Sequence, residues 1–215
     1  EKTALTGVPI RKRVAGGQAD QARETFTIFS ERPVIFFTGG SQGAEIINHT
    51  VSQLLPDLTK QYEIIHLPGP KNFEDIALET TQIVDGGGGA AYYHLAPFLD
   101  EVRMHLAYFA ADLVVSRAGA TAIFEIAAEG KPSILIPLGN AAQDHQRKNA
   151  YEYAAQGAAV VIEQNNLTPS VLLNEIQKLT ADAGRREAMA QAAKKFARPD
   201  AAEVIAREIL KLGLH

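Results

Sequence analysis

The chain has 215 residues, of which 46% are hydrophobic and 21% charged, a balance typical of one large or two small globular domains. Its net charge of −4 gives no support for broad nucleic-acid binding, and no apolar run reaches the roughly 18 residues of a membrane span. The absence of cysteine excludes disulfides and thiolate chemistry, as expected of a cytosolic protein. Because the first residue is Glu1, we expect the chain to be part of a longer protein.

Short apolar runs alternate with helical patterns along most of the chain. The predicted strands cover residues 33–38, 62–66, 90–95, 113–115, 133–137 and 159–162. The predicted helices cover residues 44–55, 72–80, 101–110, a segment that ends at Gly130, residues 144–156, and two or three segments after Thr168. This alternation predicts an α/β fold: one Rossmann-like, doubly wound parallel sheet of about six strands, covered by helices on both faces.

Two parts of the chain do not follow this alternation. Residues 1–32 are interpreted as an interdomain linker with a short amphipathic helix within 18–29, which leaves the Rossmann-like domain to residues 33–212. The four glycines from Gly86 to Gly89 predict a flexible surface loop. A nucleotide P-loop is not indicated, because the run lacks the lysine and the hydroxyl of that motif.

Two loops of small residues lead into helices at the predicted ligand-binding edge of the sheet. In an open parallel sheet this edge is formed by the carboxyl ends of the strands. GGSQG (39–43) offers Ser41 and Gly43 after a turn at Gly40, and SRAGAT (116–121) precedes another helix. Helix N-termini present unpaired N–H groups, so both loops are candidate phosphate sites. A plain glycine turn for tight strand–helix packing explains GGSQG about as well.

Thr121 and Glu125 lie on one face of the helix that follows SRAGAT, about 6 Å apart along its axis. A first-turn hydroxyl can join the backbone donors around a phosphate, and a carboxylate one turn later can accept hydrogen bonds from the diol of a ribose. The alternative is an ordinary first-turn threonine and a solvated glutamate.

The loop after the fifth strand carries several polar side chains before a helix. They are Gln143, Asp144, His145, Gln146 and Asn149. Amides and carboxylates of this kind bind sugar hydroxyls, but a solvated helix-capping loop is the alternative interpretation. The histidines of the chain do not have metal-ligand spacing, so we predict no metal and no cofactor.

Several of these stretches together resemble, in order and spacing, the C-terminal half of the MurG family. They are TGVPIR (6–11), FTGGSQGAEIIN (37–48), PFL (97–99), ADLVVSRAGATAIFEIAAEGKPSILIP (111–137) and DHQRKNA (144–150). The resemblance implies the donor-binding domain of a GT-B glycosyltransferase, in which two Rossmann-like domains enclose the active site.

The resemblance also implies roles for individual residues. Arg11, Ser41 and Gly43 would lie near the diphosphate of the donor, Phe98 and Leu99 at uracil, Ala120 and Thr121 at the phosphates, Glu125 at the ribose hydroxyls, and Gln146 with His145 at the sugar. His145 replaces the Gln or Asp often found in the family. The general base is expected in the family's N-terminal domain, so no catalytic residue is assigned in this chain.

The implied activity is inverting transfer of N-acetylglucosamine (GlcNAc) from UDP-GlcNAc to lipid I, which forms lipid II in peptidoglycan synthesis. The acceptor and the inner face of the bacterial membrane would be contacted by the N-terminal domain, and nucleic acid is not an expected partner. We expect the chain alone to bind UDP-GlcNAc weakly without turnover. The alternatives are a donor-binding or non-catalytic nucleotide-binding module with a separate acceptor partner, and another GT-B enzyme such as a UDP-GlcNAc 2-epimerase.

Overall fold

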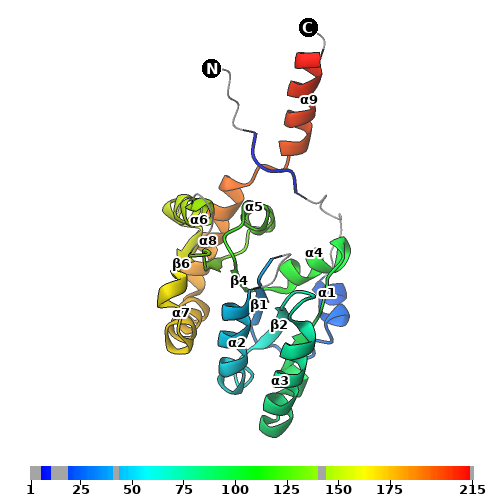
Figure 1. The fold of residues 1–215 in the computed structure, drawn as a ribbon, viewed down its shortest axis with the longest axis vertical. Helices are drawn as coiled ribbons and strands as arrows, with labels where there is room; N and C mark the ends of the chain where they lie inside the picture. The colour runs from blue at the N-terminus through cyan, green and yellow to red at the C-terminus, as the bar shows by residue number, and fades with distance from the viewer. Residues whose placement is uncertain (1–5, 11–18, 41–43, 140–143, 214–215) are drawn as a thin grey trace.

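The computed structural model describes residues 6–10, 19–40, 44–139 and 144–213, and it is built around one six-stranded parallel sheet (Figure 1). The strands are β1 (Val34–Thr38), β2 (Glu63–Leu67), β3 (Tyr93–Leu95), β4 (Leu113–Ser116), β5 (Ser133–Leu135) and β6 (Ala159–Val161). Their order across the sheet is β3-β2-β1-β4-β5-β6. The predicted doubly wound α/β fold is therefore confirmed, and every predicted strand is present.

The helices connect and cover these strands. They are α1 (Ala19–Thr25), α2 (Glu45–Leu58), α3 (Phe73–Gly87), α4 (Glu101–Ala110), α5 (Ala120–Glu129), α6 (His145–Ala155), α7 (Pro169–Ala181), α8 (Ala183–Phe196) and α9 (Ala201–Gly213). Short 3₁₀ turns lie at Ala90–Tyr92 and Gln164–Asn166.

The central strands carry apolar side chains on both faces, so each face packs its own core. Phe36 and Val114 enter a core shared with α1, α4, α5 and α6. Ile35 and Val115, their neighbours in sequence, enter a second core shared with α2 and α7. This double burial explains why the strands are continuous apolar runs rather than alternating ones.

The strand order places the topological switch point between β1 and β4, which are neighbours in the sheet. The chain moves outward from β1 to β2 and β3, and then returns to β4 before continuing to β5 and β6. Helices α2 and α5 both begin at the carboxyl ends of these two central strands. A crevice at this edge is where doubly wound sheets bind their ligands.

Two sequence predictions are corrected by the helices. The run Gly86–Gly89 is not a loop throughout, because α3 continues through Gly87 and ends at Gly88, whose φ of 68° suits glycine. Helix α2 does not stop before Pro56 but continues to Leu58, which is fully buried against the second core. In both cases the packing of one helix face outweighs a local helix-breaking signal.

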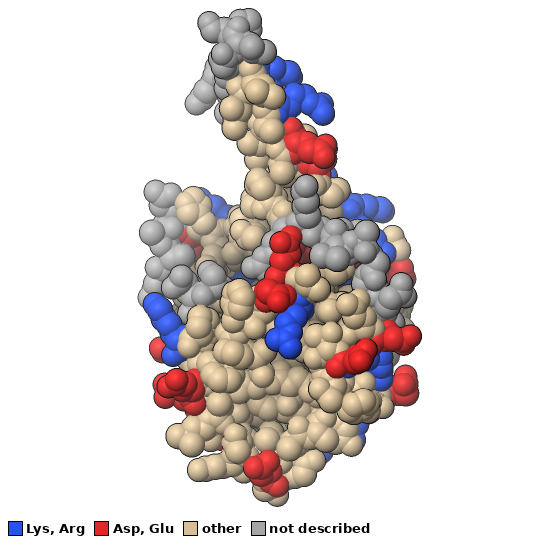
Figure 2. All heavy atoms as spheres, turned by 90° about the vertical axis from the view of Figure 1, so that its right-hand side faces the viewer, with Lys and Arg blue, Asp and Glu red and all other residues tan. Residues whose placement is uncertain are grey.

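The chain outside the sheet has two separate features. Helix α1 packs on α4 and contributes Ala22 to the first core, and Phe26, directly after the helix, joins the same core. The domain boundary at residue 33 stays a prediction. Helix α9 projects from the rest of the molecule and leaves Ile209 and Leu210 exposed (Figures 1 and 2). Within the described ranges, none of the helices combines the length and the apolar character that crossing a lipid bilayer requires.

Candidate functional site

The helices that follow the central strands begin without side-chain caps. The N-cap residues of α2, α5 and α6 make no side-chain hydrogen bond to their helices, and neither does Asn72 at the start of α3. By contrast, Asp100, Thr168 and Asp182 accept backbone N–H groups at the starts of α4, α7 and α8. The N-terminal donors of the three central helices are therefore not satisfied by their own N-cap side chains, which suits them to an external anion.

Gly119, the N-cap residue of α5, keeps space open at the start of this helix. Its backbone is extended, at φ −66° and ψ 141°, so the conformation does not require glycine. A Cβ atom built there would meet nothing within 4 Å, so internal packing does not require glycine either. The first turn of α5 contains no acidic residue. An anion can therefore approach the first turn without meeting a bulky or like-charged side chain.

The loop between β4 and α5 is held by a buried arginine that sequence reasoning did not single out. The Arg117 side chain donates from Nη1 to the carbonyl of Ile136, just after β5, at 3.2 Å. Burial lowers the pKa of the Arg117 guanidinium from its ordinary value. Arg117 thus ties together the loops that precede α5 and α6. The only sequence signal for this role is a charged residue directly after a buried strand.

Glu125 lies one helical turn after Thr121 and faces α4. It is half-buried, and the Tyr108 hydroxyl donates a hydrogen bond to its Oε2 at 3.3 Å. Thr121 is exposed at the start of the helix. Glu125 is therefore not a fully solvated carboxylate. Sequence reasoning missed Tyr108, because its hydroxyl reaches Glu125 only through the packing of α4 beside α5.

The residues predicted to border a base differ in exposure. Leu99 is buried in the first core, and Phe98, next to it before α4, is 64% exposed. This segment follows β3 and leads into the helix that carries Tyr108. An exposed ring on a buried anchor is a suitable border for a flat aromatic ligand.

A cavity of about 520 Å³ opens on the other side of α5. Its wall includes Ala120 and Phe124 of α5, Asn149 and Glu152 of α6, and the segment Thr6–Val8. Along an α-helix, Ala120 and Phe124 point about 100° away from Thr121 and Glu125. The cavity and Glu125 therefore lie on different faces of α5.

The structure holds the predicted sugar-binding residues in different ways. Gln146 accepts a hydrogen bond from the Leu138 backbone N–H through Oε1 at 3.1 Å, so its side chain braces the loop before α6. His145 is exposed at the first position of α6, and Asn149 lines the cavity one turn later. The predicted residues Arg11, Ser41, Gly43 and Gln143 lie outside the described residues.

Three of the predicted groups are brought together on or beside α5. Ala120, Thr121 and Glu125 share its first two turns, and Phe98 and Leu99 lie at the start of the neighbouring α4. The described part of the chain contains no group of three or more His, Asp or Glu side chains placed to hold a metal ion.

A parallel sheet in the order β3-β2-β1-β4-β5-β6, with open helix N-termini at its switch point, defines a doubly wound, Rossmann-like domain. Within this class, residues 34–205 match the glycosyltransferase family 28 C-terminal domain, and the chain belongs to that family.

Curated relatives and solved structures agree with this assignment. A UDP-N-acetylglucosamine--N-acetylmuramyl-(pentapeptide) pyrophosphoryl-undecaprenol N-acetylglucosamine transferase of Geobacter metallireducens is 39% identical over 98% of this chain and 56% of its own length. The crystal structure of Acinetobacter baumannii MurG is 29% identical, with a TM-score of 0.70 over 93% of this chain and 55% of that one. The resemblance to MurG is thus confirmed.

A more distant structure shares the fold alone. The UDP-GlcNAc 2-epimerase of Neisseria meningitidis, solved with UDP-GlcNAc bound, is 13% identical, with a TM-score of 0.62 over 89% of this chain and 48% of its own. The chain spans about half the length of the curated relatives that it matches.

Proposed function

We propose that this chain is the UDP-GlcNAc-binding half of an inverting glycosyltransferase that transfers GlcNAc to lipid I and forms lipid II in peptidoglycan synthesis. One observation carries the proposal: α5, whose N-terminus is open, has a carboxylate on one face and a cavity of about 520 Å³ on another. A nucleotide sugar has the same order of parts, with a diphosphate between a ribose and a hexose. The names of the curated relatives supply the donor and the acceptor.

The nucleoside half of the donor lies on the Glu125 side of α5 in this proposal. The Glu125 carboxylate accepts hydrogen bonds from the two ribose hydroxyls, and the Tyr108 hydroxyl keeps it oriented. The uracil ring rests on Phe98 beside the backbone of Leu99, which the buried Leu99 side chain anchors.

The diphosphate lies at the first turn of α5, and the sugar enters the cavity. The backbone N–H groups of Ala120 and Thr121 and the Thr121 hydroxyl bind phosphate oxygens beside Gly119. Asn149, which lines the cavity, forms hydrogen bonds with GlcNAc hydroxyls. Gln146 and His145, at the start of the same helix, bind further hydroxyls of the sugar. The cavity volume lies in the usual range for small-molecule sites.

In this proposal, the contribution of this chain to the reaction is to stabilise the leaving group. As the C4 hydroxyl of the acceptor attacks the anomeric carbon, the C1–O bond to UDP breaks and negative charge grows on the diphosphate. Fixed backbone dipoles at helix N-termini stabilise such charge without reorganisation. Arg11 and Ser41 would add to this effect. The general base, the lipid I site and the contact with the inner face of the bacterial membrane belong to an N-terminal domain.

Calorimetric titration with four ligands tests the donor site. The chain is titrated with UDP, UDP-GlcNAc, ADP and GDP up to millimolar concentrations. We expect weak binding of both uridine ligands and at least tenfold weaker binding of the purine ligands. Equal affinity for all four nucleotides would contradict the donor-site assignment.

A second candidate function is a donor-binding subunit, or a non-catalytic nucleotide-binding module, that works with a separate acceptor-domain protein. The projecting α9 favours it, because Ile209 and Leu210 are exposed apolar side chains of the kind that a partner covers. Transfer of GlcNAc that appears only when this chain is mixed with an acceptor-domain chain would support it. Tight co-purification without any transfer would favour a non-catalytic module.

A further inference from the structure

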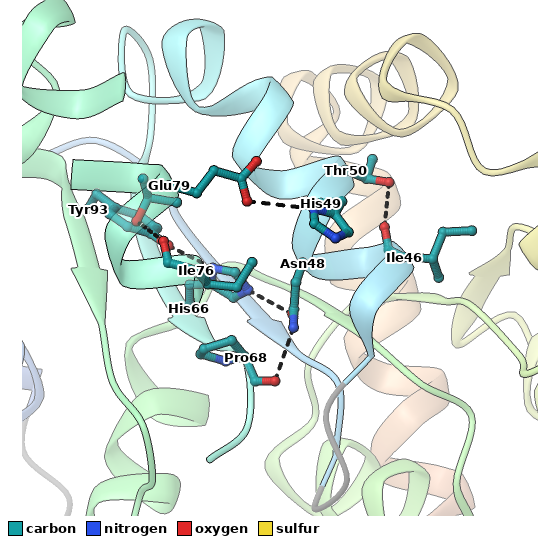
Figure 3. Close-up of polar contacts among 10 residues, drawn as sticks. Ile46, Asn48, His49, Thr50, His66, Pro68, Ile76, Glu79 and Tyr93 are labelled. Carbon is teal, nitrogen blue, oxygen red and sulfur yellow. Dashed lines mark hydrogen bonds and ion pairs between the residues drawn. The ribbon is translucent and has the colours of Figure 1, made fainter. Parts of the chain in front are cut away.

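A network of hydrogen-bonded polar side chains in the interior connects the first turn of α2 to β2 and β3. The Asn48 side chain donates from Nδ2 to the carbonyl of Pro68 at 3.1 Å, and its Oδ1 lies 3.1 Å from Nε2 of His66. On the other side of the imidazole, Nδ1 of His66 lies 2.8 Å from the Tyr93 hydroxyl. Figure 3 shows the hydrogen bonds that lead from Tyr93 through His66 and Asn48 to the carbonyl of Pro68. Asn48 and His66 are 1% and 0% exposed, so water does not compete for the two bonds of the Asn48 side chain, whereas the bond to Tyr93 is partly buried.

The carbonyl of Pro68, the acceptor at the end of this network, fixes the direction of each of the three hydrogen bonds that link Pro68, Asn48, His66 and Tyr93. The Pro68 carbonyl only accepts, so Asn48 presents its amide nitrogen there and its oxygen to His66. His66 must then carry its proton on Nε2, which leaves Nδ1 to accept from the Tyr93 hydroxyl. Burial lowers the pKa of His66 to about 3, which keeps the ring neutral with this single tautomer. One arrangement therefore satisfies all four groups.

The relay ends at the start of α2, one of the two helices that begin at the topological switch point of the sheet. Asn48 is the fourth residue of α2, the helix that starts without a side-chain cap after the Gly40 turn. Pro68 directly follows β2, so the Asn48 amide fixes the start of α2 against the carboxyl end of the neighbouring strand. Backbone donors at the start of α2 face a ligand usefully only if the helix is held in one position.

We propose that Asn48, His66 and Tyr93 form a positioning relay that sets the N-terminus of α2 for binding the diphosphate of the donor. The inference rests on the proposed function, because it assumes that the donor phosphates lie at this edge of the sheet. None of the three side chains touches the ligand. Their effect is on phosphate recognition and not on recognition of the nucleoside, whose contacts lie on α4 and α5.

Asn48→Ala tests the relay through a comparison of two ligands. We expect UDP to bind at least tenfold more weakly, and uridine within twofold of the unchanged chain. Tyr62→Phe is the matched control, because it removes a hydrogen bond, 3.0 Å long to the Thr180 hydroxyl, from the same side of the sheet at its amino end. The control should leave both affinities unchanged. An equal loss for UDP and uridine, or no loss of either, would overturn the inference.

A pair of histidine replacements tests the direction of the relay. His66→Gln places an amide nitrogen near the position of Nε2 and can still donate to Asn48, whereas His66→Asn reaches only the position of Nδ1. We expect His66→Gln to bind UDP within threefold of the unchanged chain, and His66→Asn to behave like Asn48→Ala. Similar UDP affinities for the two variants would contradict the assigned polarity. This pair also decides the question if Asn48→Ala does not fold.

A readout without ligand separates this inference from the proposed function. The backbone N–H of Asn48 donates to the Ala44 carbonyl at 2.9 Å, and its hydrogen exchange reports how firmly the first turn of α2 is held. Asn48→Ala should accelerate this exchange at least tenfold relative to Tyr62→Phe. Unchanged exchange overturns the relay even if UDP binds. If exchange accelerates but the unchanged chain shows no preference for uridine nucleotides, the relay still holds α2, and the proposed donor site is what fails.

Discussion

Lowering the pH below 6.5 should destabilise this fold through His66. The imidazole is fully buried, and burial alone lowers its pKa to about 3, against about 6.5 in an unfolded chain. Between these values the unfolded state binds a proton that the native state does not. The contribution of His66 is therefore fully present above pH 6.5 and is lost progressively as the pH falls toward 3.

The size of the effect follows from the two pKa values. At pH 5 the unfolded state gains about 2 kcal/mol from protonation of His66, and the slope below pH 6 approaches about 1.4 kcal/mol per pH unit. His66→Gln removes this titration and keeps a neutral hydrogen-bonding side chain. We therefore expect the free energy of unfolding of the unchanged chain to fall by about 2 kcal/mol more than that of the variant between pH 7.5 and pH 5.

Urea unfolding followed by circular dichroism measures this difference. The two proteins are unfolded at pH 7.5, 6.5, 5.5 and 5.0. Because the variant keeps every other titrating group, it serves as the reference for the unchanged chain. Parallel pH dependences would refute the reasoning, because they would mean that His66 takes up its proton in the native state. A steeper fall for the variant would contradict the sign of the shift.

Three further substitutions have separate expected outcomes. Glu125→Ala should weaken UDP binding by about 1–3 kcal/mol, the range for charge-assisted hydrogen bonds. It should hardly change the affinity for UDP analogues that lack both ribose hydroxyls, and an equal loss of affinity for both ligands in calorimetry would place the ribose elsewhere. Gly119→Ala should weaken UDP binding at least tenfold with little change in thermal stability, since its Cβ meets no protein atom. Gly87→Ala, also in open space, should leave UDP affinity unchanged; unaltered affinity of the first variant would count against the phosphate position. Thr168→Ala should lower the free energy of unfolding by about 1 kcal/mol because its hydroxyl accepts the Val171 N–H, and it should leave UDP affinity as it was; a loss of affinity would link α7 to the site.

The central strands β1 and β4 could be predicted because they are buried, largely apolar runs, and such runs are visible in the sequence. Val34–Thr38 and Leu113–Ser116 carry apolar residues on both faces, and their helices follow after short loops. The end of α3 was not predictable from Gly86 and Gly87, because Val84 packs against the core and the helix continues until the left-handed Gly88. Local signals therefore locate the elements better than they locate the ends of the elements.

The candidate site was predictable only where its residues lie close together in sequence. Thr121 and Glu125 share a helix face, so their relation follows from helical geometry. The contact of Tyr108 with Glu125 joins two helices, and the relay through His66 joins two strands and a helix. The sequence gives no sign of these partners, since they meet only after the sheet has assembled. The cavity beside Ala120 is likewise a product of tertiary packing.

The central claim is that the donor diphosphate binds at the first turn of α5, and amide chemical shifts measured during a UDP titration test it most directly. With a ¹⁵N-labelled chain, the account predicts that the largest shift changes fall on the N–H groups of Gly119, Ala120 and Thr121, and that inorganic phosphate alone moves the same signals weakly. The start of α7, capped by Thr168, should not respond. Shift changes that leave Gly119 to Thr121 untouched while UDP saturates another surface would contradict the account.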